Sequence, residues 1–418
     1  MRVGIVGGGI TGLTVTHALR AQDVTVNTFE AAGRPGGVIR SETVDGMCLE
    51  YGPQRIRATP AVRTLIDELG LADTVQEGDP DAPLYVYADG ALRTVPRSVK
   101  AFLRTDLLSW RAKLRLLREP FVPSGPTDGS AKEYFEAKFG AEAYDRLLGP
   151  LFGGIYASDP ARMPARHSLQ RIISLEHEHG SLLRVALDRL GSNNATPPPI
   201  TFDGGLETLP TALYNRHAAH VELNTPVLGV TPTATGAWEL ETSWGSTVVD
   251  HVVLTTPATE TAELLGELIE APLERLTYNS LAIVHLETAA RLAGFGYQTA
   301  RSSPLHTRGV TWNTGLFDRD GLVTAFLGGM DEPDVLEWTD ARLGSVAATE
   351  FETVTGHDAN VLAVTRLADR IPAYDESWNV LPFLSLPDGI SLATNYTGRL
   401  GVPSRIREAI RIAETLAD

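Results

Sequence analysis

A glycine-rich loop near the start of the chain is the segment whose spacing points most directly to chemistry. It reads Gly7-Gly8-Gly9-Ile10-Thr11-Gly12 and fits the pattern G-x-G-x-x-G. The apolar run over 2–7 predicts a strand before the loop, and the helical spacing over 10–21 predicts a helix after it. A second strand over 24–29 leads to Glu30. Because the glycines open the helix of a βαβ unit, they predict a dinucleotide-binding site.

Each residue type has a task in such a unit. Gly7 permits the tight turn, Gly9 lets the backbone approach a pyrophosphate, and Gly12 allows the helix to pack closely on the strand. The helix N-terminus and its backbone amides attract the phosphate charge. Glu30 is placed to accept hydrogen bonds from the adenosine ribose.

The next segment indicates which dinucleotide is bound. It runs Arg34-Pro35-Gly36-Gly37-Val38-Ile39-Arg40-Ser41. An acid, a short spacer, an arginine and paired glycines resemble the FAD-binding region of the flavin amine-oxidase-like oxidoreductases. The two glycines let the chain pass close to the diphosphate, and Arg34 and Arg40 can balance its charge. The sequence holds no second G-x-G-x-x-G, so we expect no separate NAD(P)H domain. Electrons then leave the flavin to oxygen or to another carrier.

Further segments resemble one family within that superfamily. The segments that carry the resemblance are 51–57 (YGPQRIR), 84–86 with 90–96, 202–210 (FDGGLETLP), 371–378 and 395–403. Together they are similar, from end to end, to the oxygen-dependent protoporphyrinogen oxidases. The resemblance implies an α/β (α+β multi-domain) protein with a Rossmann-like FAD-binding domain, a mixed-sheet substrate domain and a helical, membrane-facing insertion.

The resemblance also implies a set of contacts to non-covalently bound FAD. The residues that match the family's motifs are Gly7 to Gly12, Glu30, Ala31, Arg34, Gly37, Val38, Arg40, Gly52, Pro53, Gln54, Arg55, Val227, Trp378, Leu400, Gly401 and Val402. A helix over 404–416 follows the last of them. If its positive end points at the flavin N1–C2=O edge, it stabilises the anionic reduced flavin.

Two positions depart from the family pattern. After Val402-Pro403 the chain has Ser404-Arg405, where the family usually has Asp or Asn followed by Cys. Near Ala82, eukaryotic-type members carry an arginine that grips a substrate propionate. Arg57, Arg93, Arg97 or the basic segment over 97–119 are the candidate replacements.

The expected helices and strands, together with the resemblance, divide the chain into six segments. They are an FAD-binding domain in three parts (1–78, 196–265 and 361–418), a substrate domain in two parts (79–96 and 266–360) and a helical insertion over 97–195. Strands are expected near 221–230, 237–243, 247–254, 278–287, 309–316, 322–328 and 390–395, and helices over 60–70 and 340–355. The run 197–199 is expected to be a proline-rich linker.

The segment 97–119 is an apolar and basic island, which we interpret as one amphipathic helix. Val99, Phe102, Leu103, Leu107 and Trp110 recur at helical spacing, with arginines and lysines between them. Two interpretations stay open. The helix docks on an anionic membrane, or it is a domain helix whose charges face solvent or line a channel for an anionic substrate.

Composition excludes several classes. The 418 residues are 43% hydrophobic and 21% charged, which is ordinary for a folded globular protein of two or three domains. A net charge of −16 argues against nucleic acid as a partner. One cysteine, Cys48, excludes a disulfide framework and a cysteine zinc site. We expect a cytoplasmic protein, peripheral at the inner face of the cell membrane if the basic segment docks, and a homodimer is compatible with the sequence.

The expected reaction is the six-electron oxidation of protoporphyrinogen IX, with oxygen as acceptor. Coproporphyrinogen III is the alternative substrate. An amine oxidase often places a lysine near flavin N5, but this sequence has no lysine after Lys138. A carotenoid desaturase and an FAD-binding protein without porphyrinogen activity also stay open. No catalytic side chain is assigned, because the cofactor carries the chemistry. His177 and His179 predict a solvated helix face rather than a metal site, and Cys48 a small apolar side chain rather than a flavin link.

Overall fold

The computed structural model describes residues 1–191, 196–317, 319 and 321–417. The chain divides into two compact units. The first comprises Met1–Glu77, Pro197–Leu276 and Asn379–Asp418, and the second comprises Gly78–Thr196 and Thr277–Trp378. The division into six segments stays a prediction, and its boundary at 195–196 adjoins residues 192–195, which lie outside the described residues.

The first unit is built on a parallel sheet of five strands in the order β10-β2-β1-β14-β20. Its strands are β1 (Arg2–Val6), β2 (Thr25–Phe29), β10 (Val221–Glu222), β14 (His251–Leu254) and β20 (Ile390–Leu392). β1 pairs with β2 on one side, from Arg2 opposite Thr25 to Val6 opposite Phe29, and with β14 on the other. The strands that follow β1 in the sequence therefore lie on both sides of it, and such a switch point places a ligand-binding crevice at its carboxyl end.

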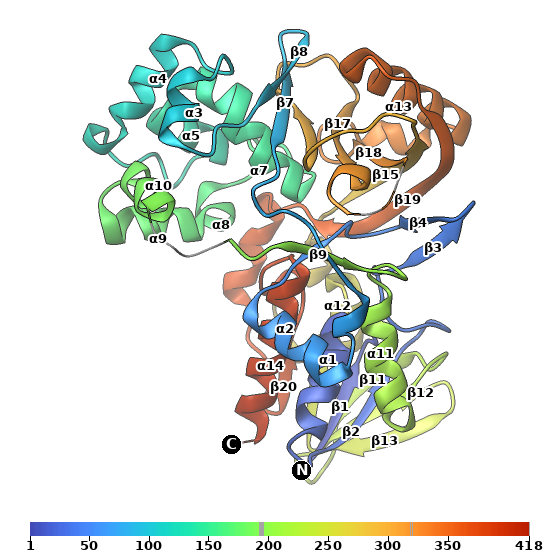
Figure 1. Ribbon diagram of the computed structural model, residues 1–418. Helices are drawn as coiled ribbons and strands as arrows, with labels where there is room; N and C mark the ends of the chain where they lie inside the picture. Colours follow the sequence, from blue (N-terminus) through green and yellow to red (C-terminus); the bar gives the residue numbers. More distant parts are fainter. Residues whose placement is uncertain (192–195, 318, 320, 418) are drawn as a thin grey trace. The chain divides into compact units, whose positions relative to one another are not determined.

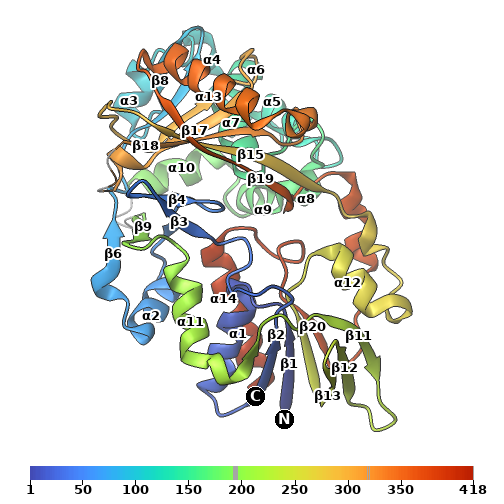
Figure 2. The same cartoon turned by 90° about the vertical axis from the view of Figure 1, so that its right-hand side faces the viewer.

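Helices cover one face of this sheet and a small antiparallel sheet covers the other (Figure 2). The helices are α1 (Ile10–Arg20) and α14 (Val402–Ala417), and the small sheet is β11 (Val227–Pro232), β12 (Trp238–Thr242) and β13 (Gly245–Val249). Gly4 lies under Leu240 and Val249, where a side chain would overlap Leu240. The small sheet reaches the strands because this position is glycine.

The rest of the first unit carries short elements around that sandwich. They are β3 (Ser41–Val44), β4 (Met47–Glu50), β5 (Ile56–Arg57), α2 (Pro60–Leu69), β6 (Val75–Glu77), β9 (Pro199–Phe202), α11 (Thr208–His217) and α12 (Ala258–Leu265). The expected linker 197–199 therefore runs into a strand, because Pro199 begins β9, which pairs with β5 and β6. A core of Leu13, Ile56, Val62, Phe202 and Leu213 packs α1, α2 and α11 together.

The second unit contains a mixed sheet of seven strands in the order β19-β15-β18-β17-β16-β7-β8. The strands are β7 (Leu84–Ala88), β8 (Ala91–Thr94), β15 (Tyr278–Glu287), β16 (Gly296–Thr299), β17 (Thr307–Trp312), β18 (Leu322–Gly328) and β19 (Asn360–Pro372). Helix α13 (Asp340–Thr355) packs on it through Leu343, Ala347 and Phe351. The expected strand 309–316 is displaced to 307–312, and a 3₁₀ turn follows it.

The same unit contains a group of helices (Figure 1). They are α3 (Val99–Arg104), α4 (Trp110–Leu117), α5 (Ala131–Phe139), α6 (Ala141–Ala143), α7 (Gly149–Tyr156), α8 (Ala165–Ser168), α9 (Gln170–His179) and α10 (Leu182–Gly191). The interior of this group of helices contains a network of charged side chains. Lys138 Nζ lies 3.0 Å from Glu119 Oε1 and 2.5 Å from Glu176 Oε1, and all three side chains are buried. Ser181 donates to Glu119 over 2.5 Å, and Tyr134 donates to Glu176.

The prediction of a single helix over 97–119 is wrong. The segment forms two helices, α3 and α4, separated by Thr105–Ser109. Leu107 is fully buried in that break, and the Ser109 hydroxyl caps α4 by accepting from Ala112 N. Lys113 is buried and donates to the carbonyls of Leu103 and Thr105, so it closes the end of α3. The chain breaks because these local caps replace a continuous helical ladder.

Candidate functional site: a dinucleotide cradle at the end of β1

The glycine loop is held at the carboxyl ends of three neighbouring strands. Gly7 N donates to Phe29 O of β2 over 2.8 Å. Thr255, directly after β14, donates its hydroxyl to Val6 O over 2.9 Å and to Gly7 O over 3.2 Å. Thr255 was not predicted from the sequence. Its place after a predicted strand was the available signal, because ligands of open α/β sheets bind at the carboxyl ends of strands.

The glycines of the loop meet different constraints. Gly7 has φ +110°, which a residue with a side chain rarely adopts. A Cβ on Gly12 would overlap the Gly7 carbonyl oxygen, so this glycine sets the close packing of α1 on β1. Where a Cβ on Gly9 would stand, no atom lies within 4 Å. Gly9 caps α1 with ordinary extended angles, so the space beside it is open rather than filled by the fold.

Glu30 ties the loop to the next segment. Its Oε2 accepts from Gly8 N at 2.6 Å, and its Oε1 accepts from Ala32 N at 2.8 Å. Ala31 between them is exposed. Gly36 N donates to Gly8 O at 2.9 Å, so the paired glycines lie against the glycine loop. The tertiary structure therefore brings together the two motifs that the sequence separates by more than twenty residues.

The two arginines of this segment have local partners. Arg34 donates to Gly37 O over 2.6 Å and to Ile39 O over 3.2 Å, so its guanidinium shapes the turn. Arg40 pairs with Glu42 at 2.9 Å and lies over the Tyr51 ring. Val38 is 42% exposed beside them. A single exposed apolar side chain is ordinary at a protein surface, so the contact of Val38 with the cofactor stays a prediction.

The segment 52–55 runs next to Val38. A Cβ on Gly52 would overlap the Val38 carbonyl oxygen, so only glycine allows this approach. Pro53 is half-buried, and the Gln54 amide nitrogen donates to Glu50 O at 2.8 Å and Gly52 O at 3.1 Å. Burial, together with the charge of Arg57, lowers the pKa of Arg55 to about 10.

Segment 202–210, which carried part of the family resemblance, is hydrogen-bonded to the residues just beyond Arg40. Glu207 accepts from Ser41 N at 2.8 Å. Glu50 is buried and accepts from Leu206 N at 2.9 Å and from the Ser41 hydroxyl at 2.6 Å. A Cβ on Gly205 would meet Cys48 Sγ at 2.8 Å, and Cys48 is half-buried. Glu50 was not predicted from the sequence, although it is a buried acid at the end of β4.

The C-terminal part of the site is the entry into α14. Leu400 and Val402 are half-buried, and Gly401 is exposed where its carbonyl accepts from Ser404 N at 2.8 Å. Arg405 is buried, pairs with Glu408, and donates to the carbonyls of Arg399 and Thr394. Arg405 belongs to the first departure from the family pattern, Ser404-Arg405, and its hydrogen bonds anchor the loop before α14.

The remaining predicted cofactor contacts lie in both units. Val227 begins β11 in the first unit, beside a shift in strand register between Val227 and Gly229. Trp378 lies in the second unit, where it is buried and stacked on Tyr374 with ring centroids 4.0 Å apart.

The predicted substrate arginines are also divided. Arg57, in the first unit, donates to Pro197 O at 3.0 Å. In the second unit, Arg93 pairs with Asp106, whereas Arg97 donates to Pro80 O at 2.8 Å and lies over the Phe295 ring. Phe295 belongs to an apolar cluster with Ala82, Leu316 and Phe317. Arg97 is therefore the cation beside the position where the sequence lacks the expected arginine.

The described residues of the first unit fit a dinucleotide. Open space beside Gly9, backbone amides at the start of α1 and the acid Glu30 are what a diphosphate and a ribose require. In addition, Gln54 Oε1 is buried and has no hydrogen-bond partner among the described residues. Among those residues no group of three or more His, Cys, Asp or Glu side chains is placed to hold a metal ion.

Comparison with known proteins defines the class. Residues 10–417 match the family described as flavin containing amine oxidoreductase, and the chain belongs to this family. It is a flavin-dependent oxidoreductase, as the sequence predicted. Solved structures share the fold: a protein from Exiguobacterium sp. assigned provisionally as a protoporphyrinogen oxidase has a TM-score of 0.80 at 24% identity, covering 100% of this chain and 98% of that one. A putrescine oxidase has a TM-score of 0.73 at 17% identity, covering 100% and 99%.

Similar proteins confirm the predicted resemblance to the protoporphyrinogen oxidases. Protoporphyrinogen oxidase 1 of Spinacia oleracea is 29% identical over 84% of this chain and 70% of its own length. Protoporphyrinogen oxidase 2 of Arabidopsis thaliana is 26% identical over 99% and 93%. Coproporphyrinogen III oxidase of Mycobacterium leprae is 27% identical over 99% and 97%.

Proposed function

We propose that this chain binds FAD without a covalent link and oxidises protoporphyrinogen IX to protoporphyrin IX. The observation that carries the cofactor is the joining of the glycine loop to Glu30 and to Gly36. The similarity to protoporphyrinogen oxidases over most of the chain supports the substrate. Six electrons and six protons leave the macrocycle in three two-electron rounds, and three molecules of oxygen accept them as hydrogen peroxide.

The flavin supplies a two-electron acceptor that oxygen can regenerate. The chain's own residues bind and orient it. Amides at the start of α1 neutralise the diphosphate, and Glu30 holds the ribose hydroxyls. The N-terminus of α14, kept in place by Arg405, provides positive charge for the reduced ring. Gln54 and Trp378 are further predicted contacts.

Binding of a porphyrinogen requires apolar contact for the macrocycle and cations for its propionates. The second unit offers both in one place, because Arg97 lies over Phe295 at the edge of the cluster that includes Ala82. Arg97 therefore replaces the family arginine in this proposal. Arg93 is a weaker candidate since Asp106 already neutralises it.

Coproporphyrinogen III is the second candidate substrate. The likeness to the Mycobacterium leprae coproporphyrinogen III oxidase extends over nearly the whole of both chains and supports this alternative, as the similar coverage of protoporphyrinogen oxidase 2 supports the first substrate. Its extra propionates need additional cations, for which Arg57 and the basic segment 97–119 are the candidates predicted from the sequence. Amine oxidation is disfavoured because no lysine follows Lys138 in the sequence.

A membrane surface is the proposed partner of the two helices α3 and α4. Among the described residues no helix is long and apolar enough to cross a bilayer. Trp110, Leu114 and Leu117 recur at i, i+4 and i+7 on α4 and are all exposed, and Phe121 beyond them is 86% exposed. Arginines flank this apolar stripe. An exposed apolar face with cations beside it suits the headgroup region of an anionic membrane.

The deciding experiment is porphyrin fluorescence after mixing the flavin-loaded protein with each porphyrinogen in air, with uncatalysed oxidation subtracted. Faster turnover of protoporphyrinogen IX supports the proposal. Faster turnover of coproporphyrinogen III replaces the substrate with the alternative. If a protein that holds FAD turns over neither, the chain lacks porphyrinogen activity. Flavin released by acid precipitation identifies FAD and shows whether the link is covalent.

A further inference from the structure

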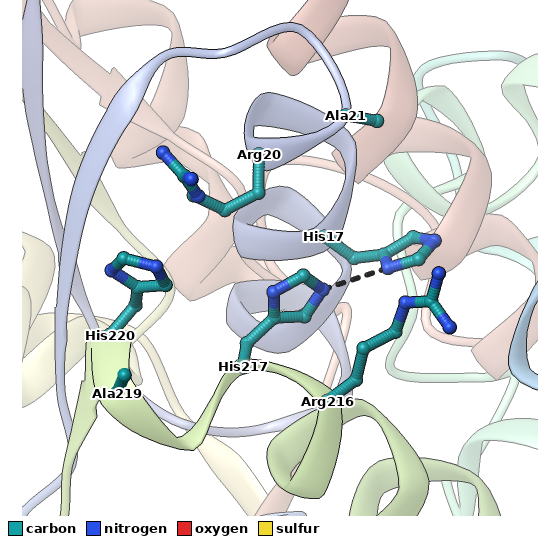
Figure 3. A pocket seen from close by; sticks show the side chains of 7 residues that line it. All are labelled: His17, Arg20, Ala21, Arg216, His217, Ala219 and His220. Carbon is teal, nitrogen blue, oxygen red and sulfur yellow. Dashed lines mark hydrogen bonds between the residues drawn. The ribbon is translucent and has the colours of Figure 1, made fainter.

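A basic pocket lies at the far end of α1 from the glycine loop, in the first unit. Its volume is about 320 Å³. At 1.5 Å per residue, His17 lies roughly 12 Å along the helix from Gly9, so the pocket is separate from the dinucleotide cradle. The lining side chains come from α1, from α11 and from the 3₁₀ turn after α11: His17, Arg20, Ala21, Arg216, His217, Ala219 and His220 (Figure 3).

Two of the three histidines that line the pocket are held in a chain of hydrogen bonds. His17 Nε2 lies 2.9 Å from Glu68 Oε2 of α2, and His17 Nδ1 lies 2.9 Å from His217 Nε2. With a proton on His17 Nε2 toward the carboxylate, His17 Nδ1 accepts from His217 Nε2. The second ring nitrogen of His217 is then the atom left to gain a proton. In Figure 3 it is on the side of Arg20 and His220.

Two arginines are fixed on the wall of this pocket. Arg20 donates to Val24 O at 2.9 Å, and Arg216 donates to Glu68 O at 3.3 Å. Each of these bonds uses one of the five N–H donors of a guanidinium group, so the group is positioned and still has donors to offer. In the view of Figure 3 the imidazole of His217 lies between the two arginine side chains.

The electrostatics of the pocket oppose a further positive charge. Burial, followed by the charges of His17, Arg216, His220 and Arg20, lowers the pKa of His217 to about 4. Burial opposes a charge of either sign, whereas the positive charges of the surrounding side chains create a potential that attracts an anion. This surface is positive in a chain whose net charge is −16, so it is not a continuation of the general charge. A metal ion would be repelled by the same arginines.

We propose that this pocket binds a phosphate group. Two guanidinium forks and imidazole N–H groups suit a compact dianion whose oxygens point in several directions, whereas a single carboxylate offers one edge. The volume lies at the lower end of small-molecule sites, which run from roughly 300 to 1,000 Å³. The phosphate is therefore free or carried on a small organic molecule. The proposal is independent of the porphyrinogen reaction.

Binding is coupled to protonation. The groups facing His217 are His17 and Arg20 from α1, and Arg216 and His220 from its own side, with Glu68 of α2 reached through His17. A bound dianion offsets the positive potential and favours a proton on His217. The affinity for a dianion therefore rises as the pH falls from 7.5 to 5.5.

The test uses the flavin-loaded protein, so that a phosphate cannot enter the dinucleotide site. Calorimetric titration with inorganic phosphate and with glycerol 3-phosphate, at ionic strength matched with chloride, measures the affinity. We expect saturable binding that Arg20→Ala and Arg216→Ala each weaken by about tenfold, as loss of a charge-assisted hydrogen bond does. Arg411→Ala, an exposed arginine of α14, is the control for charge and should bind like wild type. Tighter binding of glycerol 3-phosphate identifies an organic ligand, and equal binding identifies free phosphate.

Sulfate serves for the pH series because it stays a dianion throughout. Wild type should bind it more tightly at pH 5.5 than at pH 7.5, and the ratio of the two affinities should be several-fold smaller in His217→Gln. The proposal is overturned if the folded Arg20→Ala/Arg216→Ala double variant binds as wild type does. It is equally overturned if wild type shows no saturable binding at either pH, or if chloride competes as well as phosphate.

Discussion

Glu30 Oε2 accepts a 2.6 Å hydrogen bond from the backbone amide of Gly8, so the acid that follows β2 is joined directly to the loop that follows β1. The same loop accepts from Gly36 N. Three segments of the sequence therefore converge on one cradle, and these bonds hold the glycine loop in shape before any ligand arrives. A preorganised loop lowers the cost of binding an anionic diphosphate.

Two glycine substitutions should separate folding from flavin binding. Gly12→Ala places a methyl group on the Gly7 carbonyl, and we expect low yield of folded protein with little flavin. Gly9→Ala meets no atom within 4 Å, so it should fold with its stability kept. It should nonetheless lose flavin, since the new methyl group occupies the space for the diphosphate. Flavin absorbance per folded chain measures both, and full flavin content in Gly9→Ala would contradict the prediction.

Arg97→Ala should weaken substrate binding. The loss of one charge-assisted contact to a propionate predicts a KM about tenfold higher, with kcat changed little. Steady-state kinetics with protoporphyrinogen IX measures the two constants. Arg93→Ala is the matched control, because its partner Asp106 already occupies that guanidinium and its effect should be smaller. An unchanged KM for Arg97→Ala would remove this residue from the binding site.

Lys138 should be a large contributor to stability. Lys138→Met leaves Glu119 and Glu176 buried without their cation, which costs about 3–5 kcal/mol. Lys132→Met is the control, since Lys132 pairs with Glu136 at 3.9 Å on the surface, and such pairs contribute about 0–1 kcal/mol. Urea unfolding followed by circular dichroism compares them. Similar midpoints for the two variants would show that the buried network contributes nothing special.

The same network predicts a loss of stability in acid. Burial by itself raises the pKa of Glu119, but hydrogen bonds from Ser181, Lys138 and the backbone amides of Leu183 and Leu182 outweigh it and hold the pKa below its usual 4.5. Because the folded state then binds fewer protons than the unfolded state, the stabilisation is present above pH 4.5 and disappears as the pH falls through the folded value.

Thermal unfolding from pH 6 to pH 3 measures this dependence. Glu119→Gln should flatten the acid part of the curve, at the cost of lower stability near neutral pH. Glu42→Gln, at an exposed position, should run parallel to wild type. Parallel curves for Glu119→Gln and wild type would assign the acid sensitivity to other carboxylates.

The apolar stripe of α4 should mediate contact with anionic membranes. Trp110→Ser combined with Phe121→Ser should reduce flotation with anionic liposomes at low salt several-fold, because both side chains are largely exposed and apolar. Trp244→Ser is the matched control, since Trp244 is 80% exposed in the β12–β13 turn of the other unit. If wild type does not co-migrate with anionic liposomes, the membrane proposal fails.

The local elements of the cradle were predictable from the sequence. Strand, loop and helix over 2–21 carry their own periodicity, and the helix over 340–355 was predicted at the bounds that α13 has. The hairpins β3–β4 and β7–β8 were not predicted. Their two-residue turns are Asp45-Gly46 and Asp89-Gly90, which adopt the positive φ that such turns favour. Strand β19 was also missed, because it is an edge strand with one buried residue among its 13 and no clear alternation.

What the sequence determined by itself is the dinucleotide motif and the class of oxidoreductase, since both rest on short-range spacing and on family segments. Only the tertiary structure decided which side chains support the motif. Thr255, Glu50 and Arg405 act through partners that lie distant in sequence or across a loop, and no periodicity encodes such partners. The same holds for the pocket at His217, whose residues meet because α1 packs against α11.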